Sequence, residues 1–370
     1  MKRRLTFIKP SIRWVCSSHS PQTLMDAASD QDQALYPRRY EVKRVLVSSR
    51  SFGELSDVGA RMLKEEGFDV WRIPSEERPL NESKMVEIVA RENPEVVVSG
   101  AEPITKPVLE ASPNLSMIMK HGVGVDNIDI QAATMLGILV ANAPGTNTAA
   151  VADLTLAMML ALLRGVYGAV QSTKGGGWQR YVGHDLGALT VGVVGTGRIG
   201  LAVIRRLQGF GSDVLACDIV HDKDLLSYSK VHYVELEELL RDSDVVTLHV
   251  PLVAATRAMI GRNELEMMKS TAYLVNMARG ELADEGALFE CLQKKRIAGA
   301  AVDVYAVEPP RSSPLIGLDN VLSTPHIAAY TFESMEHMGR ICAQTIIDAL
   351  RPVECPNILN PQAMAHKRSS

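Results

Sequence analysis

A glycine-rich turn is the most specific chemical signal in this sequence of 370 residues. Gly195, Gly197 and Gly200 follow the apolar run 191–194, and a helical pattern begins at once. In this spacing the first glycine permits a tight turn, the second lets the backbone approach a pyrophosphate, and the third lets the helix pack on the strand. Unpaired N–H groups at the helix N-terminus would face the phosphates. The pattern predicts a dinucleotide site, against the alternative of a glycine turn in a sheet that binds nothing.

One acidic residue distinguishes between the two nicotinamide dinucleotides. Asp218 ends the next predicted strand, 18 residues after Gly200. An acid at this place accepts hydrogen bonds from the adenosine ribose hydroxyls and repels a 2′-phosphate. We therefore predict NAD rather than NADP as the cofactor.

Hydride transfer to a ketone builds negative charge on oxygen, so such a site needs a proton donor that titrates near neutral pH. Among the nine histidines, His326 lies just past a predicted strand end, where ligands bind in this fold class. His249 also lies late in a strand and can equally be a packed core histidine, and His121 precedes Gly122 and could touch substrate. The remaining histidines lie in polar or helical surroundings typical of the surface: His19, His184, His221, His232, His337 and His366.

Two charged residues could complete this chemistry. Arg279 lies between a predicted strand end and Gly280, where a fixed cation could stabilise the developing charge. Glu308 follows another strand and precedes Pro309, and a carboxylate beside His326 would orient the ring. By position alone, however, Arg279 fits a surface arginine better than a functional one, and Glu308 fits an exposed loop acid.

Alternating strands and helices must position these side chains. Predicted strands cover 45–47, 70–73, 96–98, 117–119 and 138–140, with helices at 54–66, 106–110 and 130–136. A long helix over 147–172 ends at three glycines, 175–177, and six further strands follow at 191–194, 214–217, 245–249, 273–276, 300–303 and 321–323. This alternation is typical of right-handed β-α-β units in a parallel sheet.

The expected fold class is therefore α/β, with two Rossmann-like doubly wound parallel-sheet domains and a cleft between them. The last predicted helix, 332–350, is long enough to cross back onto the first domain. We expect a flavodoxin-like substrate-binding domain of residues 43–142 and 333–360, and an NAD-binding domain of residues 143–332.

Composition excludes several other classes. The net charge of −4 gives no reason to expect nucleic acid or anionic lipid as a partner. Five scattered cysteines without a C-x-x-C pair predict no disulfide scaffold and no metal site, and fit a reducing, cytoplasmic environment. No apolar stretch reaches the roughly 18 residues that span a bilayer.

The N-terminal segment 1–42 differs from the rest of the chain. It is basic and serine-rich, with no acid before Asp26. That composition fits either a poorly ordered extension or an organelle-targeting segment, which would change the expected location.

Several motifs, in their order along the chain, resemble the D-isomer-specific 2-hydroxyacid dehydrogenase family. They lie at 122–129, 143–147, 150–153, 195–200, 248–252, 276–280, 301–309 and 325–327, and the resemblance runs from about 45 to 357. It implies an enzyme that interconverts 2-keto acids and D-2-hydroxy acids with NAD.

The resemblance also assigns roles to residues. It makes His326 the acid/base, Glu308 its hydrogen-bonding partner, and Arg279 the cation that binds the substrate carboxylate and carbonyl. Backbone N–H groups of Val123 and Gly124 would hold the substrate carboxylate. The remaining expected cofactor contacts are Val151, Gly195, Gly197, Arg198, Ile199, Gly200, Asp218, Val250, Pro251, Thr256, Met277, Ala278 and Asp303, the last at the nicotinamide carboxamide.

Segments 51–53, 102–105 and 122–126 resemble the 3-phosphoglycerate dehydrogenases most closely, in their short form because about 20 residues follow the last predicted helix. Lys120 replaces a usual arginine and would contact the substrate phosphate, with help from Arg50. Segment 98–100 lacks the arginine that some members carry, and a lysine does not offer the bidentate geometry of an arginine. Glyoxylate or hydroxypyruvate reduction is therefore an alternative, and an NAD-sensing, non-enzymatic corepressor is another.

The helix over 151–163 is apolar around most of its circumference, so it must be covered. In relatives this region forms the dimer contact, which implies a homodimer. The alternative is burial within one subunit.

Overall fold

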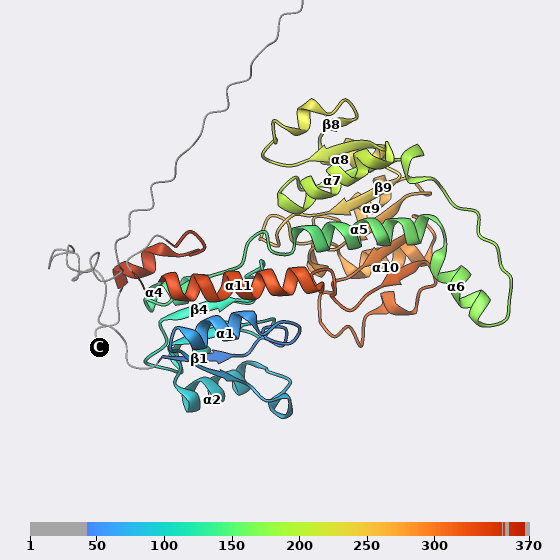
Figure 1. Ribbon diagram of the computed structural model, residues 1–370. Helices are drawn as coiled ribbons and strands as arrows, with labels where there is room; N and C mark the ends of the chain where they lie inside the picture. The colour runs from blue at the N-terminus through green and yellow to red at the C-terminus, as the bar shows by residue number, and fades with distance from the viewer. Residues whose placement is uncertain (1–42, 350, 352–354, 367–370) are drawn as a thin grey trace, which may run out of the picture.

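The computed structural model describes residues 43–349, 351 and 355–366, so the segment 1–42 and its expected role lie outside the described residues. Two parallel sheets with helices on their faces lie side by side (Figure 1). The predicted α/β fold class with two doubly wound domains is confirmed. The predicted boundaries of the two domains stay a prediction.

The smaller sheet has five parallel strands in the order β2-β1-β3-β4-β5. They are β1 (Arg44–Val47), β2 (Asp69–Arg72), β3 (Val96–Ser99), β4 (Met117–Lys120) and β5 (Leu139–Ala141). The accompanying helices are α1 (Val58–Glu65), α2 (Glu82–Glu92), α3 (Lys106–Glu110), α4 (Ile130–Met135) and α11 (Phe332–Ala349). β3 and β4 are buried on both faces, which explains their continuous apolar sequences.

Each face of this sheet has its own core, because successive strand residues point to opposite sides. Leu46 and Val97 face α2, α3 and α4, whereas Val45 and Val47 face α1 and α11. Figure 1 shows α11 beside α1, as expected for a helix that returns to the first domain. The chain therefore enters the smaller domain twice.

The larger sheet has seven parallel strands in the order β12-β11-β10-β9-β6-β7-β8. They are β6 (Thr190–Val194), β7 (Asp213–Cys217), β8 (Val231–Tyr233), β9 (Val245–Leu248), β10 (Tyr273–Asn276), β11 (Gly299–Val302) and β12 (Val321–Ser323). The strand order reverses between β9 and β6, and ligands bind beyond the carboxyl ends of strands at such a switch point.

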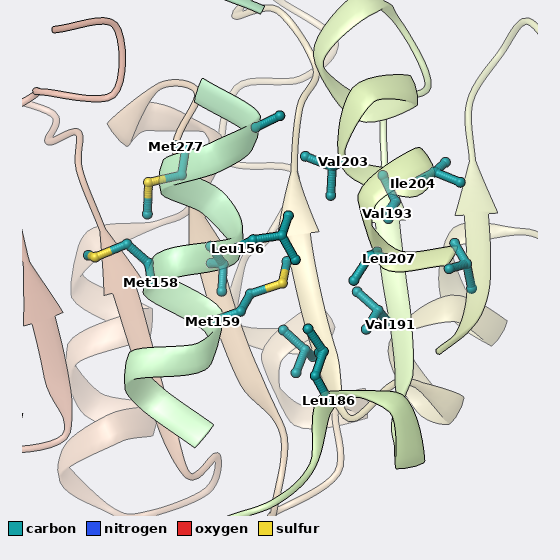
Figure 2. Packing of buried hydrophobic residues seen from close by; sticks show 14 of the residues in the cluster. Leu156, Met158, Met159, Leu186, Val191, Val193, Val203, Ile204, Leu207 and Met277 are labelled. Carbon is teal, nitrogen blue, oxygen red and sulfur yellow. The ribbon is translucent and has the colours of Figure 1, made fainter. Parts of the chain in front are cut away.

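Its helices are α5 (Thr148–Leu163), α6 (Val166–Lys174), α7 (Arg198–Phe210), α8 (Leu236–Asp242), α9 (Arg262–Met267) and α10 (Glu285–Gln293). α5 packs beside α7 on one face of the sheet. Figure 2 shows Leu156 and Met159 of α5 among the side chains of Val193 and Leu207. A second cluster, built around Leu239, Leu274 and Leu288, fills the opposite face.

The structure differs from the expected elements at four places. The three-residue edge strand β8 and the helix α2 were not predicted, and α1 begins at Val58 rather than at residue 54. The expected long helix 147–172 is two helices, because Gly165 adopts a left-handed conformation with φ of +57°. No single helix in the described part of the chain is long and apolar enough to cross a membrane, although α5 and α6, bent by 67°, pass that test as a pair.

α5 is covered by its own chain, which corrects the expected reason for a homodimer. Val151, Leu156, Met158 and Met159 are buried in the core of the larger domain. The partly buried leucines of α5 also pack against this core: Leu154, Leu160 and Leu162. The burial expected from a partner subunit is thus provided by α7 and the sheet.

Candidate active site

The glycine turn joins β6 to α7 at the switch point of the larger sheet. Gly195 has φ of +94°, and a Cβ there would lie 2.7 Å from the carbonyl carbon of His249. A Cβ on Gly200 would lie 1.9 Å from the Gly195 oxygen, so this helix start can approach the strand only as glycine. A Cβ on Gly197 would meet nothing within 4 Å, which leaves open space before the first turn of α7. Two tight glycines and one open glycine at a helix N-terminus fit a dinucleotide pyrophosphate.

Asp218 holds this turn in place. Its Oδ2 accepts hydrogen bonds from the Thr196 N–H at 2.6 Å and the Thr196 hydroxyl at 3.2 Å, and its Oδ1 accepts from the Val220 N–H at 3.2 Å. We expected the carboxylate to face the ribose. In the structure it also fixes the backbone of the glycine turn, a contact that spacing along the chain does not predict.

The other residues expected around the cofactor fall into two groups. Val250 lies against Gly195, Thr256 ties the following loop by a bond to the Pro251 carbonyl at 2.6 Å, and Arg198 is exposed near Gly145. Buried or partly buried beside these are Val151, Ile199, Met277 and Ala278, of which Val151 and Met277 belong to the core.

His326 and Glu308 lie side by side in the larger domain. His326 Nδ1 is 2.8 Å from Glu308 Oε2, and Glu308 Oε1 accepts the Tyr305 N–H at 3.1 Å. Burial raises the pKa of Glu308, but the His326 hydrogen bond and charge, the Tyr305 N–H and Arg279 outweigh it, so this pKa is lower than usual. An ionised Glu308 thus fixes the ring through Nδ1 and leaves Nε2 for a substrate. The structure brings together the pair expected from the sequence.

The loop that carries His326 is tied to Asp303 beneath it. His326 has φ of +54°, an uncommon backbone conformation for a non-glycine residue. The buried Asp303 carboxylate accepts bonds from the Thr324 hydroxyl at 2.7 Å and from the Ile327 and Ala328 N–H groups at 2.8 Å each. We expected this carboxylate at the nicotinamide. Both its oxygens organise the His326 loop, and the contact with the nicotinamide stays a prediction.

Arg279 reaches from the larger domain to the small-domain glycine loop. Its Nε donates to Asp126 Oδ1 at 2.9 Å, and its side chain lies so close to Gly124 that any Cβ there would clash with it. The Asn276 side chain donates to the Arg279 carbonyl at 2.7 Å and fixes the local turn. Arg279 also acts electrostatically on Glu308, which places it near the His326–Glu308 pair.

Lys120, expected at the substrate phosphate, is turned inward. It is buried, and its ammonium donates to the Gly100 carbonyl and to Asn127 Oδ1. Burial is the main cause that lowers its pKa to about 8. The structure therefore does not present Lys120 to a ligand, because nearby oxygens of its own loop capture the charge.

The Val123 and Gly124 backbone N–H groups, expected at the substrate carboxylate, have no acceptor among the residues that the structure describes. They lie in the loop that Arg279 contacts. Two free amides beside a guanidinium can bind a carboxylate.

The competing histidines are unsuited to proton transfer at neutral pH. Burial lowers the pKa of His121 to about 4, with Lys120 adding to the effect, and burial lowers the pKa of His249 to about 3. His121 bonds to Ser51 at 2.9 Å, and His249 to the Thr247 hydroxyl at 3.0 Å. Both are packed, neutral side chains.

Two supporting residues were missed at the sequence level. Asp126, the partner of Arg279, stands inside the motif 122–129, and Asn276 opens the motif 276–280. Both residues lie inside motifs that were named from the sequence, but only the fold shows what they contact. Within the described residues no group of three or more histidine, cysteine or acidic side chains is arranged to hold a metal ion.

Residues 156–328 match the family described as D-isomer specific 2-hydroxyacid dehydrogenase, NAD binding domain, which confirms NAD as the predicted cofactor. The chain is 41% identical to a D-3-phosphoglycerate dehydrogenase of Methanocaldococcus jannaschii, over 76% of this chain and 54% of that protein. It is 37% identical to a glyoxylate reductase of Korarchaeum cryptofilum, over 84% of this chain and 95% of that protein.

A solved structure adds a third likeness. The D-lactate dehydrogenase of Aquifex aeolicus, in complex with NAD and lactic acid, has a TM-score of 0.76 at 28% identity and covers 86% of this chain and 99% of its own. The chain spans about half the length of the first archaeal phosphoglycerate dehydrogenases that it matches, 54% and 58%. On this sequence and structural similarity, the chain belongs to the D-isomer specific 2-hydroxyacid dehydrogenase family.

Proposed function

We propose that the protein is an NAD-dependent D-2-hydroxyacid dehydrogenase and that its substrate is 3-phosphoglycerate. The observation that carries the activity is the His326–Glu308 pair at 2.8 Å, with Arg279 reaching across to the small-domain glycine loop. An acid/base, its orienting carboxylate and a fixed cation are the groups that ketone reduction requires.

In this proposal the glycine turn of Gly195, Gly197 and Gly200 would hold NAD, whose chemistry when bound would be to supply or accept a hydride. His326 Nε2 gives a proton to the substrate oxygen or takes it away, while Glu308 holds the ring and stabilises its charged form. Arg279 stabilises negative charge on that oxygen. The Val123 and Gly124 N–H groups hold the substrate carboxylate, and closure of the two domains excludes water.

Glyoxylate or hydroxypyruvate is the second candidate substrate. The inward position of Lys120 favours these unphosphorylated acids. Its ammonium, which was expected to bind the phosphate, donates to the Gly100 carbonyl and to Asn127 Oδ1 instead. The likeness to a D-3-phosphoglycerate dehydrogenase and to a glyoxylate reductase supports each candidate in turn.

A panel of acids tests both parts of the proposal. Purified protein is assayed by NADH absorbance with 3-phosphoglycerate, D-glycerate, hydroxypyruvate and glyoxylate, each with NAD(H) and with NADP(H). We expect turnover with NAD(H) and the highest kcat/KM on 3-phosphoglycerate. No turnover with any 2-hydroxy or 2-keto acid would contradict the activity, and a preference for glyoxylate would contradict only the substrate.

We also propose a homodimer, now on different residues. The segment after α5 exposes large apolar side chains: Val166, Tyr167, Val170, Trp178, Tyr181 and Val182. A concentration of apolar groups on one arm is typical of an interaction site. Light scattering tests it: we expect a dimeric mass that the pair Trp178→Ser and Val182→Asp reduces to the monomer, and a monomeric mass for the unmodified chain would reject it.

A further inference from the structure

A cavity of about 1030 Å³ lies between the two domains, and arginines dominate its wall. Arg50, Arg72 and Arg78 come from the smaller domain, and Arg311 comes from the larger one. Glu308 also lines this cavity, so it opens beside the catalytic pair. Nothing in the proposed mechanism uses the four arginines.

The fold places this cavity where a ligand would be expected. The small sheet reverses its strand order between β1 and β3, which makes that edge a second switch point. Arg50 lies three residues after β1 ends, and Arg72 is the last residue of β2. Carboxyl ends of two adjacent parallel strands thus deliver guanidinium groups to one side of the cleft.

The four guanidinium groups lack acidic partners. None of them forms an ion pair with a carboxylate among the described residues, whereas Arg44 and Arg91 of the same domain each pair with at least two. Arg78 donates to the Ser48 carbonyl at 2.6 Å, and Arg72 donates to the Arg50 carbonyl, so both are held toward the cavity by neutral groups. Burial and the charges of Arg50 and Arg72 lower the pKa of Arg78, although Glu102 and Glu54 oppose this.

The cavity therefore carries excess positive charge. Glu54 is its one other acidic wall residue besides Glu308, and Glu308 is held by His326. Four cations facing two carboxylates, one of them engaged, leave room for a group of about two negative charges. Guanidinium groups also match the geometry of phosphate oxygens. A monocarboxylate has fewer oxygens and would occupy fewer of these hydrogen-bond donors.

We infer that this arginine cavity binds the phosphate monoester of a phosphorylated 2-hydroxy acid whose reacting carbon lies at His326. The inference rests on the proposed function and names the residues that would make the substrate phosphorylated. It places the phosphate at Arg50, Arg72, Arg78 and Arg311 instead of at the buried Lys120. The substrate then spans the cleft, with its carboxylate at the Val123 and Gly124 amides and its phosphate at the arginines.

Arg50 and Arg311 suit the test best, because both side chains are exposed and neither donates a hydrogen bond in the described structure. The double variant Arg50→Gln/Arg311→Gln removes one charge from each domain, and Arg50→Lys/Arg311→Lys keeps the charges without the forked geometry. Arg296→Gln is the matched control, since Arg296 is exposed, unpaired in the described structure and outside the cavity. Thermal melting checks that all three variants fold.

The readout is the ratio of kcat/KM for 3-phosphoglycerate to kcat/KM for D-glycerate, its unphosphorylated counterpart. We expect the glutamine pair to lower this ratio by about tenfold or more, the lysine pair to lower it less, and Arg296→Gln to leave it unchanged. A ratio that stays within twofold in the glutamine pair, or that falls equally in Arg296→Gln, overturns the inference.

A binding measurement separates this inference from the proposed function. If the unmodified protein oxidises neither acid, the proposed function fails. Calorimetric titration of 3-phosphoglycerate in the presence of NAD then measures binding at the cavity without any turnover. Loss of that binding in the glutamine pair supports the cavity, and equal binding overturns it. Inorganic phosphate is the second probe: if it binds as tightly as 3-phosphoglycerate, the cavity takes the free anion and the substrate assignment is overturned.

Discussion

The two sheets present different chemistry at the same topological place. At the switch point of the larger sheet, small residues and backbone amides leave open space before α7, and Asp218 accepts hydrogen bonds from the turn. At the switch point of the smaller sheet, Arg50 and Arg72 project from strand ends. A site built from backbone amides suits the pyrophosphate that both nicotinamide dinucleotides share, whereas long charged side chains suit a charged group that distinguishes one substrate from another.

The proposed catalytic pair lies in the same domain as the glycine turn. His326 and Glu308 both lie in the larger domain. The loop that carries His326 is fixed by buried hydrogen bonds to Asp303. Arg279 alone reaches across, to Asp126 of the smaller domain. In the proposed function, the acid/base and the cofactor site therefore belong to one domain, whereas substrate recognition is divided between the two.

The largest effect is expected from removing the proton donor of the larger domain. His326→Ala should lower kcat by about 10²–10⁴-fold with little change in NAD binding, because general acid–base catalysis contributes that much. The measurement is steady-state NADH oxidation together with NADH fluorescence titration. Near-normal turnover would show that the larger domain does not hold the acid/base.

The glycine turn separates structural from ligand-binding glycines. Gly200→Ala places a Cβ against the Gly195 oxygen, so we expect unfolding to become easier by about 1–3 kcal/mol, as for overpacked sites. Gly197→Ala meets open space, so melting should stay unchanged while NAD affinity falls. Calorimetric melting without cofactor, followed by NAD titration, checks both. Equal destabilisation by the two changes would argue that the open space is not a ligand site.

Acid should weaken both domains through one buried histidine each. The pKa of His121 is about 4 and that of His249 about 3, because burial disfavours the imidazolium. The unfolded chain therefore binds more protons below about pH 6.5, and stability should fall toward acid by about 1 kcal/mol per pH unit for each histidine.

Melting temperatures at pH 7 and pH 5 measure this loss. His121→Asn should flatten the dependence of the smaller domain and His249→Asn that of the larger one. A profile that neither variant changes would mean that other groups govern acid sensitivity.

The smallest effect is expected at the contact between the domains. Asp126→Asn keeps an oxygen for Arg279 but removes the charge of a pair whose side chains are 27% and 36% exposed. Because solvent screens such a pair, we expect kcat/KM to fall by only about two- to fivefold. Kinetics at low and high salt would show a difference that shrinks with salt. A loss as large as that of His326→Ala would give Asp126 a direct part in the chemistry.

Most of the fold could be predicted because apolar runs such as those of β3 and β4 are continuous and bounded by helical patterns. The edge strand β8 was not predicted, because three residues that differ in burial give only a weak sequence pattern. The break at Gly165 was not predicted, because the apolar pattern continues past it. One residue in the left-handed conformation is enough to change the direction of the chain there.

The site was predictable where motifs are local and unpredictable where contacts are distant. Arg279, Glu308 and His326 were each expected, but the capture of Lys120 depends on Gly100, 20 residues earlier. Of the four arginines of the cavity, Arg50 was expected near a phosphate and the other three were not, for the same reason. The wall residues of the cavity come from three separate segments that only the packing of the two domains brings together.

The anchoring of the His326 loop by Asp303 has a consequence for how such a protein can change over time. Because a buried carboxylate fixes this loop from below, substitutions on the opposite wall of the cleft leave the position of the imidazole intact. We therefore expect exchange of charged side chains in the loops after β1 and β2 to change specificity without moving the imidazole. Directed evolution of substrate range should begin in those two loops.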